Sequence, residues 1–174
     1  MSPEVALDVG RTYALIHEGA CALRISRDVV VVHGEDARRW LQGQVSQDIE
    51  ALGIGQSAET LVLAPQGKVE AYCRATLLSD DLVLLDTEAG HGEGLFERLR
   101  RFRLRVKAEL EFATVSCLRV LGPDSAASLA RSGLQTGGVN ASAPLASAPL
   151  SEGWILAVPV TWPGYAGFDV LTPA

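Results

Sequence analysis

A run of alternating residues at positions 68–78 is the part of the sequence best suited to hold a ligand. Such alternation is typical of a strand, whose successive side chains point to opposite faces. One face would carry small and apolar residues and pack against helices: Val69, Ala71, Cys73, Ala75 and Leu77. The other would carry hydrogen-bonding residues: Lys68, Glu70, Tyr72, Arg74 and Thr76. Tyr72 can stack on a flat ring and Arg74 can pair with a carboxylate, so this polar face either lines a ligand or is a solvated sheet face.

A second candidate lies near the end of the sequence, in the glycine-rich run WPGYAGFD from Trp162 to Asp169. The carboxylate of Asp169 can accept two hydrogen bonds from the polar edge of a ligand. The alternative interpretation is a glycine-rich hairpin turn with an exposed aspartate.

Motifs for nucleophilic, nucleotide and metal chemistry are absent from the sequence. It contains no GxSxG, P-loop, HExxH or GxGxxG pattern and no CxxC pair. The three cysteines are far apart and the three histidines stand alone: Cys21, Cys73, Cys117, His17, His33 and His91. We therefore predict no catalytic residue and no metal site, and a reduced, cytoplasmic chain.

Net charge and the distribution of charged and apolar residues limit the classes of molecule that the chain is expected to bind. The 174 residues carry a net charge of −6, which argues against general nucleic-acid binding. The basic run between Arg98 and Lys107 is either a solvated helix end or a site for an acidic partner or the acidic tail of a ligand. The first twenty residues include four charged side chains, and no apolar run is long enough to span a membrane, so neither a signal peptide nor a membrane segment is predicted.

A family resemblance rests on several of these motifs and their order. The run WLQGQVSQD from Trp40 to Asp48 resembles the LQGQ-T-D segment of the YgfZ-like folate-binding proteins, relatives of the glycine cleavage aminomethyltransferase, the T-protein. The run ETLVLAPQG from Glu59 to Gly67 is similar to the hairpin that follows in that family. The likeness continues to Phe168-Asp169, and because family members are about twice as long, the chain resembles their N-terminal half.

The resemblance implies tetrahydrofolate as ligand and gives four candidate ligand-binding residues: Tyr72, Arg74, Tyr165 and Asp169. In the transferases, the strand at 68–78 carries an acidic residue near the folate and the aminomethyl nitrogen. Ala71 and Tyr72 stand at the matching positions here. Tyr165 likewise replaces the first acid of the family's TGE-x-GFE element, whereas Asp169 matches the second. The family's K-G-C-x-x-G-Q-E motif has no counterpart here.

Three functions are compatible with this pattern. The first is a folate-binding accessory protein, similar to the YgfZ-like factors of iron–sulfur protein maintenance, without transferase chemistry. The second is a tetrahydrofolate-dependent, aminomethyltransferase-like enzyme that needs a second chain to complete its site. The third is a non-catalytic structural subunit that keeps the fold without a ligand.

The elements predict an α+β fold: a ferredoxin-like split β-α-β lobe followed by a second, truncated α+β lobe. Residues 1–112 would form the first, folate-binding lobe and residues 113–174 the second, with a mobile loop at 135–153. Strands are expected at 21–26, 29–33, 60–64, 68–78, 82–86, 106–112, 115–121, 154–160 and 167–171. Helices are expected at 36–49, 87–102 and 125–131, and residues 1–19 as an extended or frayed arm. Asp36 is the expected N-cap of the first helix, and Trp40 lies on its apolar stripe, which predicts a core position.

Assembly is predicted from the second lobe. Its last two strands carry apolar residues that no further helix would cover: Ile155, Leu156, Ala157, Val160, Phe168, Val170 and Leu171. Open sheet edges and apolar faces favour pairing with another chain. We therefore expect a homodimer, or a complex with a separate protein that corresponds to the C-terminal half of the family.

Overall fold

A computed structural model describes residues 9–134, 155–160 and 163–173 of the chain. These residues form a seven-stranded antiparallel sheet in the order β2-β3-β4-β1-β5-β7-β6. The strands are β1 (Cys21–His33), β2 (Ser57–Leu63), β3 (Val69–Ser79), β4 (Leu82–Glu88), β5 (Glu109–Leu121), β6 (Leu156–Pro159) and β7 (Gly167–Pro173). The helices are α1 (Val9–Glu18), α2 (Ala37–Gln42), α3 (Gly92–Phe102) and α4 (Ser125–Arg131). The predicted α+β class is confirmed.

The predicted split β-α-β unit is present. β4 and β5 both pair antiparallel with β1, which lies between them, so they are parallel to each other and α3 connects them. The same relation recurs further along the sheet, where β5 and β6 flank β7 and both pair antiparallel with it. Because β5 belongs to both arrangements, it joins the two ends of the sheet.

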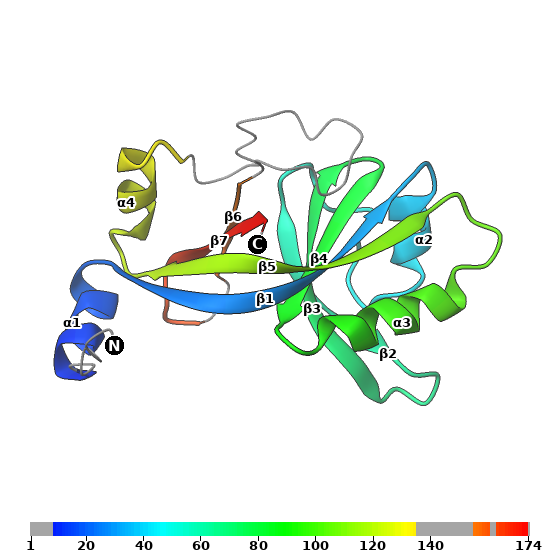
Figure 1. Ribbon diagram of the computed structural model, residues 1–174, viewed down its shortest axis with the longest axis horizontal. Helices are drawn as coiled ribbons and strands as arrows, with labels where there is room; N and C mark the ends of the chain where they lie inside the picture. The colour runs from blue at the N-terminus through cyan, green and yellow to red at the C-terminus, as the bar shows by residue number, and fades with distance from the viewer. Residues whose placement is uncertain (1–8, 135–154, 161–162, 174) are drawn as a thin grey trace, which may run out of the picture.

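The long strands β1 and β5 cross the whole molecule side by side (Figure 1) and pair over all 13 residues of each. β5 therefore runs through positions 112 and 113, where we predicted the boundary between lobes. The division into lobes stays a prediction, and the loop predicted at 135–153 lies outside the described residues. Strands were expected separately at 21–26 and 29–33, with a turn at Arg27-Asp28 between them. That turn is wrong, because both residues continue β1.

Helices α2, α3 and α4 cover one face of the sheet, here called the helix face. Val30 and Val32 of β1 point to it, as do the small and apolar residues of β3, as their alternation predicted. Trp40 of α2 lies in the same cluster with 8% of its surface exposed, and Leu95 and Leu99 of α3 are buried beside it. The predicted core position of Trp40 is confirmed.

The first predicted helix is shorter than its pattern indicated. α2 ends at Gln42, and the side-chain Oε1 of Gln42 accepts hydrogen bonds from the backbone amides of Ile49 and Glu50 at 2.6 and 3.1 Å. Such side-chain bonds compete with helical ones and favour turns. Asp36 precedes α2 as predicted, but its carboxylate accepts from the amide of Lys107 at 2.9 Å instead of capping the helix.

The other face of the sheet, here called the inner face, curls on itself. Val29 and Val31 of β1 pack there in one cluster with residues from both ends of the sheet: Leu78, Leu82, Leu84, Leu156, Val158 and Leu171. Ala157 and Val170 pack in a separate cluster with Leu129 of α4. The apolar residues of β6 and β7 are therefore buried within the chain, with Leu156, Ala157, Val170 and Leu171 at most 6% exposed. The uncovered apolar face predicted for these strands is wrong. Within the arm expected at residues 1–19, which we predicted to be extended or frayed, residues 9–18 instead form α1.

Candidate functional site

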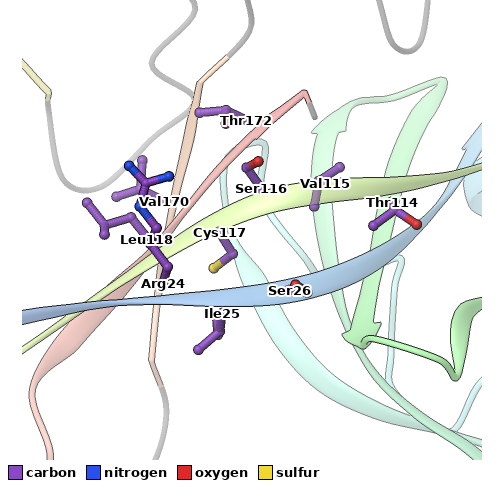
Figure 2. Close-up of a pocket in the computed structure, with 10 residues that line it drawn as sticks. All are labelled: Arg24, Ile25, Ser26, Thr114, Val115, Ser116, Cys117, Leu118, Val170 and Thr172. Carbon is purple, nitrogen blue, oxygen red and sulfur yellow. The ribbon is translucent and has the colours of Figure 1, made fainter. Parts of the chain in front are cut away.

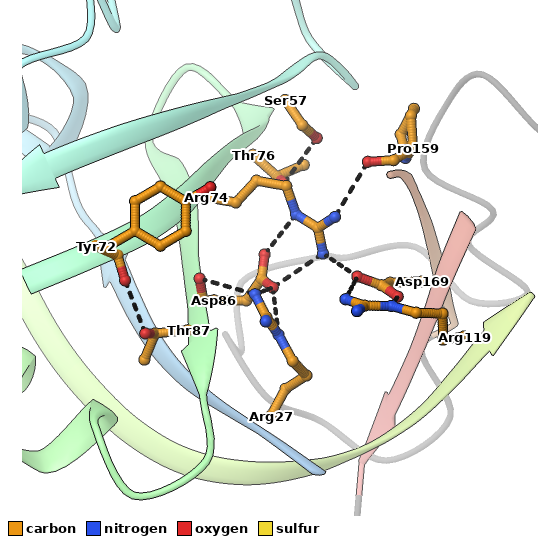
Figure 3. Close-up of polar contacts among 10 residues, drawn as sticks. All are labelled: Arg27, Ser57, Tyr72, Arg74, Thr76, Asp86, Thr87, Arg119, Pro159 and Asp169. Atoms are coloured by element: carbon orange, nitrogen blue, oxygen red, sulfur yellow. Dashed lines mark hydrogen bonds and ion pairs between the residues drawn. The ribbon is translucent and has the colours of Figure 1, made fainter. Parts of the chain in front are cut away.

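Arg74 is the centre of a buried ionic network on the inner face (Figure 3). Its guanidinium donates to both carboxylate oxygens of Asp86, each at 2.9 Å, and to Oδ2 of Asp169 at 3.1 Å. It also donates to the backbone carbonyl of Pro159 in β6 at 3.1 Å. Arg74 is 2% exposed and both aspartates are 0% exposed, so these charges are removed from water.

Two further arginines complete the network. Arg27 of β1 donates through Nε to Asp86 at 2.9 Å and forms a second contact through Nη2. Arg119 of β5 donates through Nε and Nη2 to the two oxygens of Asp169, at 2.7 and 2.9 Å. Each aspartate therefore faces two arginines, and the bidentate geometry is the favourable one for a guanidinium and a carboxylate.

The sheet positions these side chains by register and by curvature. Arg74 lies directly opposite Asp86 on neighbouring strands, and Arg119 lies directly opposite Asp169. The two pairs are far apart in strand order, and the curl of the sheet brings Arg74 to Asp169 and to Pro159. The network therefore ties the two ends of the sheet together across the inner face.

The pKa directions agree with a permanently charged network. Burial opposes the charge on Asp169, but the hydrogen bond from Arg119 and the charge of Arg74 outweigh it and lower the pKa of Asp169. Burial also opposes the charge on Arg74, but Asp86 and Asp169 raise its pKa overall. The hydrogen bond to Asp169 raises the pKa of Arg119. Asp169, Arg74 and Arg119 are therefore charged at neutral pH.

A small cavity of about 30 Å³ lies above the network. Its lining consists of Arg27, Glu59, Tyr72, Arg74, Glu88, Arg119, Val160 and Asp169. A space of this size holds water but no aromatic ring system. Larger cavities of about 320 and 360 Å³ adjoin it, and Glu88 lines all three.

Tyr72 stands at the rim of this cavity with 53% of its surface exposed. Burial and a hydrogen bond to Glu59 raise the pKa of its phenol, so the ring is neutral at physiological pH. The hydroxyl of Thr87 donates to the backbone carbonyl of Tyr72 at 2.8 Å and fixes its position next to β4 (Figure 3). A ligand ring can therefore reach Tyr72 from solvent.

Three of the four predicted ligand residues meet here. Tyr72, Arg74 and Asp169 line the same small cavity, although Arg74 and Asp169 are buried against each other. Tyr165 does not line it; its ring lies 5.9 Å from that of His17 in α1. Whether these residues bind a ligand stays a prediction.

Sequence reasoning missed five residues of this region: Arg27, Glu59, Asp86, Glu88 and Arg119. Arg27 was assigned to a turn, and Asp86 only marked the end of a strand. Their partners are distant in sequence, so no local spacing indicated them. The alternation that placed Arg74 on the polar face of its strand was the one available signal.

A cavity of about 480 Å³ lies on the helix face, and Figure 2 shows the residues that line it. Hydroxyl side chains of β1, β5 and β7 line it together with Arg24 and Leu118: Ser26, Thr114, Ser116 and Thr172. None of the four predicted ligand residues lines it.

Two kinds of feature are absent from the described residues. They contain no group of three or more histidine, cysteine or acidic side chains placed to hold a metal ion. Within residues 9–134, 155–160 and 163–173, no helix has the length and hydrophobicity needed to cross a bilayer.

Comparison with known proteins places this geometry in a family. No curated protein matches the chain. Among solved structures, the chain is similar to the glycine cleavage system aminomethyltransferase T from Bartonella henselae, with a TM-score of 0.73 and 22% sequence identity. The match covers 88% of this chain and 42% of that protein, so the chain spans less than half of its length. The family model described as the GCVT N-terminal domain matches residues 26–173, and the chain therefore belongs to this family.

Proposed function

We propose that the chain is a folate-binding accessory protein without transferase chemistry of its own. The observation that carries this proposal is the state of the two carboxylates beneath Tyr72. Asp86 and Asp169 are each held by two arginines and buried, so neither is available to stabilise a reacting amine or to relay a proton. Tyr72, in contrast, presents an exposed ring at the rim of the cavity.

The volumes of the cavities around Tyr72 limit where a folate could lie. A pterin ring does not fit the space of about 30 Å³ above the network, so the ring would lie on the rim and extend over the larger adjoining cavities. In this arrangement Tyr72 contacts the ligand, whereas Arg74 and Asp169 act from below by fixing the strands. Tyr165 lies beside His17 and makes no contact in this arrangement.

Calorimetric titration with tetrahydrofolate tests the proposal. We expect saturable binding, and we expect Tyr72→Ala to weaken it roughly two- to tenfold, the usual contribution of an aromatic stacking pair. Tyr13→Ala is the matched control, because Tyr13 of α1 is also exposed and lines none of the three cavities. No saturable binding up to millimolar ligand would contradict the proposal.

The accessory role we propose is the YgfZ-like one, in iron–sulfur protein maintenance. Two of the three cysteines are poor candidates for reactive groups, because burial raises the pKa of Cys73 and of Cys117 to about 12. The role would therefore act through ligand or protein binding. In cells that lack the chain, iron–sulfur enzyme activity should fall and be restored by the wild type but not by Tyr72→Ala. Unchanged activity in those cells would remove this role.

A second candidate is an active aminomethyltransferase, favoured by the similarity to aminomethyltransferase T over 88% of this chain. Because the chain spans 42% of that protein, activity would require groups from another chain. An assay with an aminomethylated lipoyl carrier and tetrahydrofolate decides between the two. We expect no turnover by the isolated chain, and measurable turnover would favour the enzyme.

The state of assembly bears on the same choice. We propose a homodimer or a complex with a separate C-terminal-half protein, now through a surface other than the buried apolar faces of β6 and β7. Light scattering at micromolar concentration should give about twice the 18.5 kDa chain mass for the homodimer. If neither folate binding nor turnover is found, a purely structural subunit becomes the best description.

A further inference from the structure

Glu88, the last residue of β4, differs from the other acids near the cavity. Asp86 and Asp169 are held by arginines, and Glu59 is hydrogen-bonded to Tyr72. Glu88 is exposed, and its backbone carbonyl accepts from the amide of His91 at 3.2 Å. Its carboxylate makes no hydrogen bond or ion pair with the described part of the chain. Both of its carboxylate oxygens therefore remain available to a ligand.

Alternation along β4 places Glu88 on the inner face, the same face as Asp86. The side chain accordingly lines the small cavity above the network and the adjoining cavity of about 320 Å³. Arg27 lies directly opposite Glu88 in the pairing of β1 with β4, but Nε and Nη2 of Arg27 are directed at Asp86. Glu88 thus stands beside the network without being part of it.

Register brings Glu88 next to Tyr72. The pairing of β3 with β4 ends at Arg74 opposite Asp86, and two more residues along each antiparallel strand bring Tyr72 level with Glu88. Beyond the last pair of the ladder, the hydroxyl of Thr87 donates a hydrogen bond to the backbone carbonyl of Tyr72 at 2.8 Å. An exposed ring and a carboxylate without a partner are therefore fixed side by side on the inner face.

This pair matches one kind of heterocycle. A 2-amino-4-oxopteridine presents two parallel N–H donors, one on the 2-amino group and one on N3, along one edge of a flat ring. A carboxylate accepts both, and a neighbouring tyrosine can stack on the ring. We infer that Glu88 is the residue that selects the 2-amino-4-oxopteridine ring, with Tyr72 as its stacking partner. The inference rests on the proposed folate binding and names the specificity-determining residue of that site.

The experiment compares pterin with lumazine, which carries an oxo group in place of the 2-amino group. Binding to the full chain is followed by the ligands' fluorescence. The wild type should bind pterin more tightly, by about tenfold or more, because loss of a hydrogen bond to a charged group has an effect of this order. Glu88→Gln should abolish the preference, since an amide offers one acceptor oxygen and turns its own N–H groups toward the ligand donors.

Glu93→Gln is the matched control, because Glu93 is an exposed acid on the first turn of α3 that lines none of the three cavities. It should keep the wild-type preference. A preference for pterin that persists in Glu88→Gln would overturn the role of Glu88 and leave the proposed function intact. A wild type that binds neither pterin nor tetrahydrofolate would overturn both. Circular dichroism and the unfolding midpoint of each variant confirm that it is folded.

Discussion

The helix face and the inner face of the sheet each carry a buried cluster, but the two clusters are held by different kinds of contact. On the helix face, leucines of α2 and α3 and the ring of Trp40 pack against the valines of β1. On the inner face, the valines of β1 give way to Arg27, and five charged side chains from five strands fill the space. The apolar side tolerates small adjustments of shape, whereas a charged cluster requires that each member keep its partners.

The inner face restricts the geometry of the fold more tightly than the helix face does. Apolar burial on the helix face is non-directional, and many similar sequences would satisfy it. On the inner face, Arg74 sets the distance between β3 and β7 and between β3 and β6 through single bonds of 3.1 Å. We therefore expect the inner face to determine how the sheet curls.

Replacement of Asp86 tests the inner face with the largest expected effect. Asp86→Ala would leave Arg27 and Arg74 without their shared carboxylate, and removal of one partner of a buried ion pair costs about 3–5 kcal/mol. With two arginines affected, we expect the upper end of this range in urea unfolding. A loss below about 1 kcal/mol, the value of a surface pair, would show that water reaches the network.

Replacement of Trp40 tests the helix face. The side chain is 8% exposed and its Nε1 lies 3.4 Å from the carbonyl of Phe102, so Trp40→Ala removes a large buried surface. Such truncations cost about 3–5 kcal/mol, and the melting temperature should fall clearly. A melting temperature within a few degrees of the wild type would mean that the helix face does not depend on α2.

Acidification should weaken the inner face through Asp169. The pKa of Asp169 is lowered, so its carboxylate stabilises the fold above the unfolded-chain pKa of about 3.9. That stabilisation is lost as the pH falls through the lower, folded-state value. The free energy of unfolding should therefore decrease below about pH 4, and carboxyl ¹³C titration should place Asp169 below its ordinary range. An ordinary or raised value would refute the assignment of the network as permanently charged.

A surface ion pair provides the smallest expected effect. Arg38 of α2 contacts Asp80 at 2.7 Å, and the carboxylate side chain of Asp80 is 82% exposed. Asp80→Asn should change the free energy of unfolding by at most about 1 kcal/mol, because water screens the pair. This variant is also the control for Asp86→Ala, since it removes one aspartate charge outside the network. A loss equal to that of Asp86→Ala would mean that burial does not distinguish the two sites.

Much of the fold could be predicted from local pattern. The alternation of β3 and the apolar stripe of α3 indicated the right elements, because each element buries one face in the same apolar cluster. The full length of β1 could not be predicted from local pattern. Arg27 and Asp28 are typical of a turn, but Arg27 pairs with Asp86, and the carboxylate of Asp28 accepts from the amides of Gly90 and Gly92 at 2.7 and 3.0 Å.

The site was less accessible to sequence reasoning. A polar strand face was interpreted as solvated or ligand-lining, and neither interpretation indicated that Arg74 is buried in an ionic network with partners from β4, β6 and β7. The distance in sequence from Arg74 to Asp169 hides that pairing from any local pattern. The same limit applies to Glu88 at the rim of the cavity. Its carboxylate stands out only once the structure shows that the neighbouring aspartates are paired with arginines.

The full-length pairing of β1 with β5 has a consequence for folding. Cys21 pairs with Leu121 and His33 with Glu109, so the central ladder of the sheet joins residues that are far apart in the sequence. Closing a loop that long costs chain entropy before these two strands can pair, which slows folding relative to a chain with local contacts. During synthesis, β1 must wait until β5 has left the ribosome, and until then its edge is open to other chains.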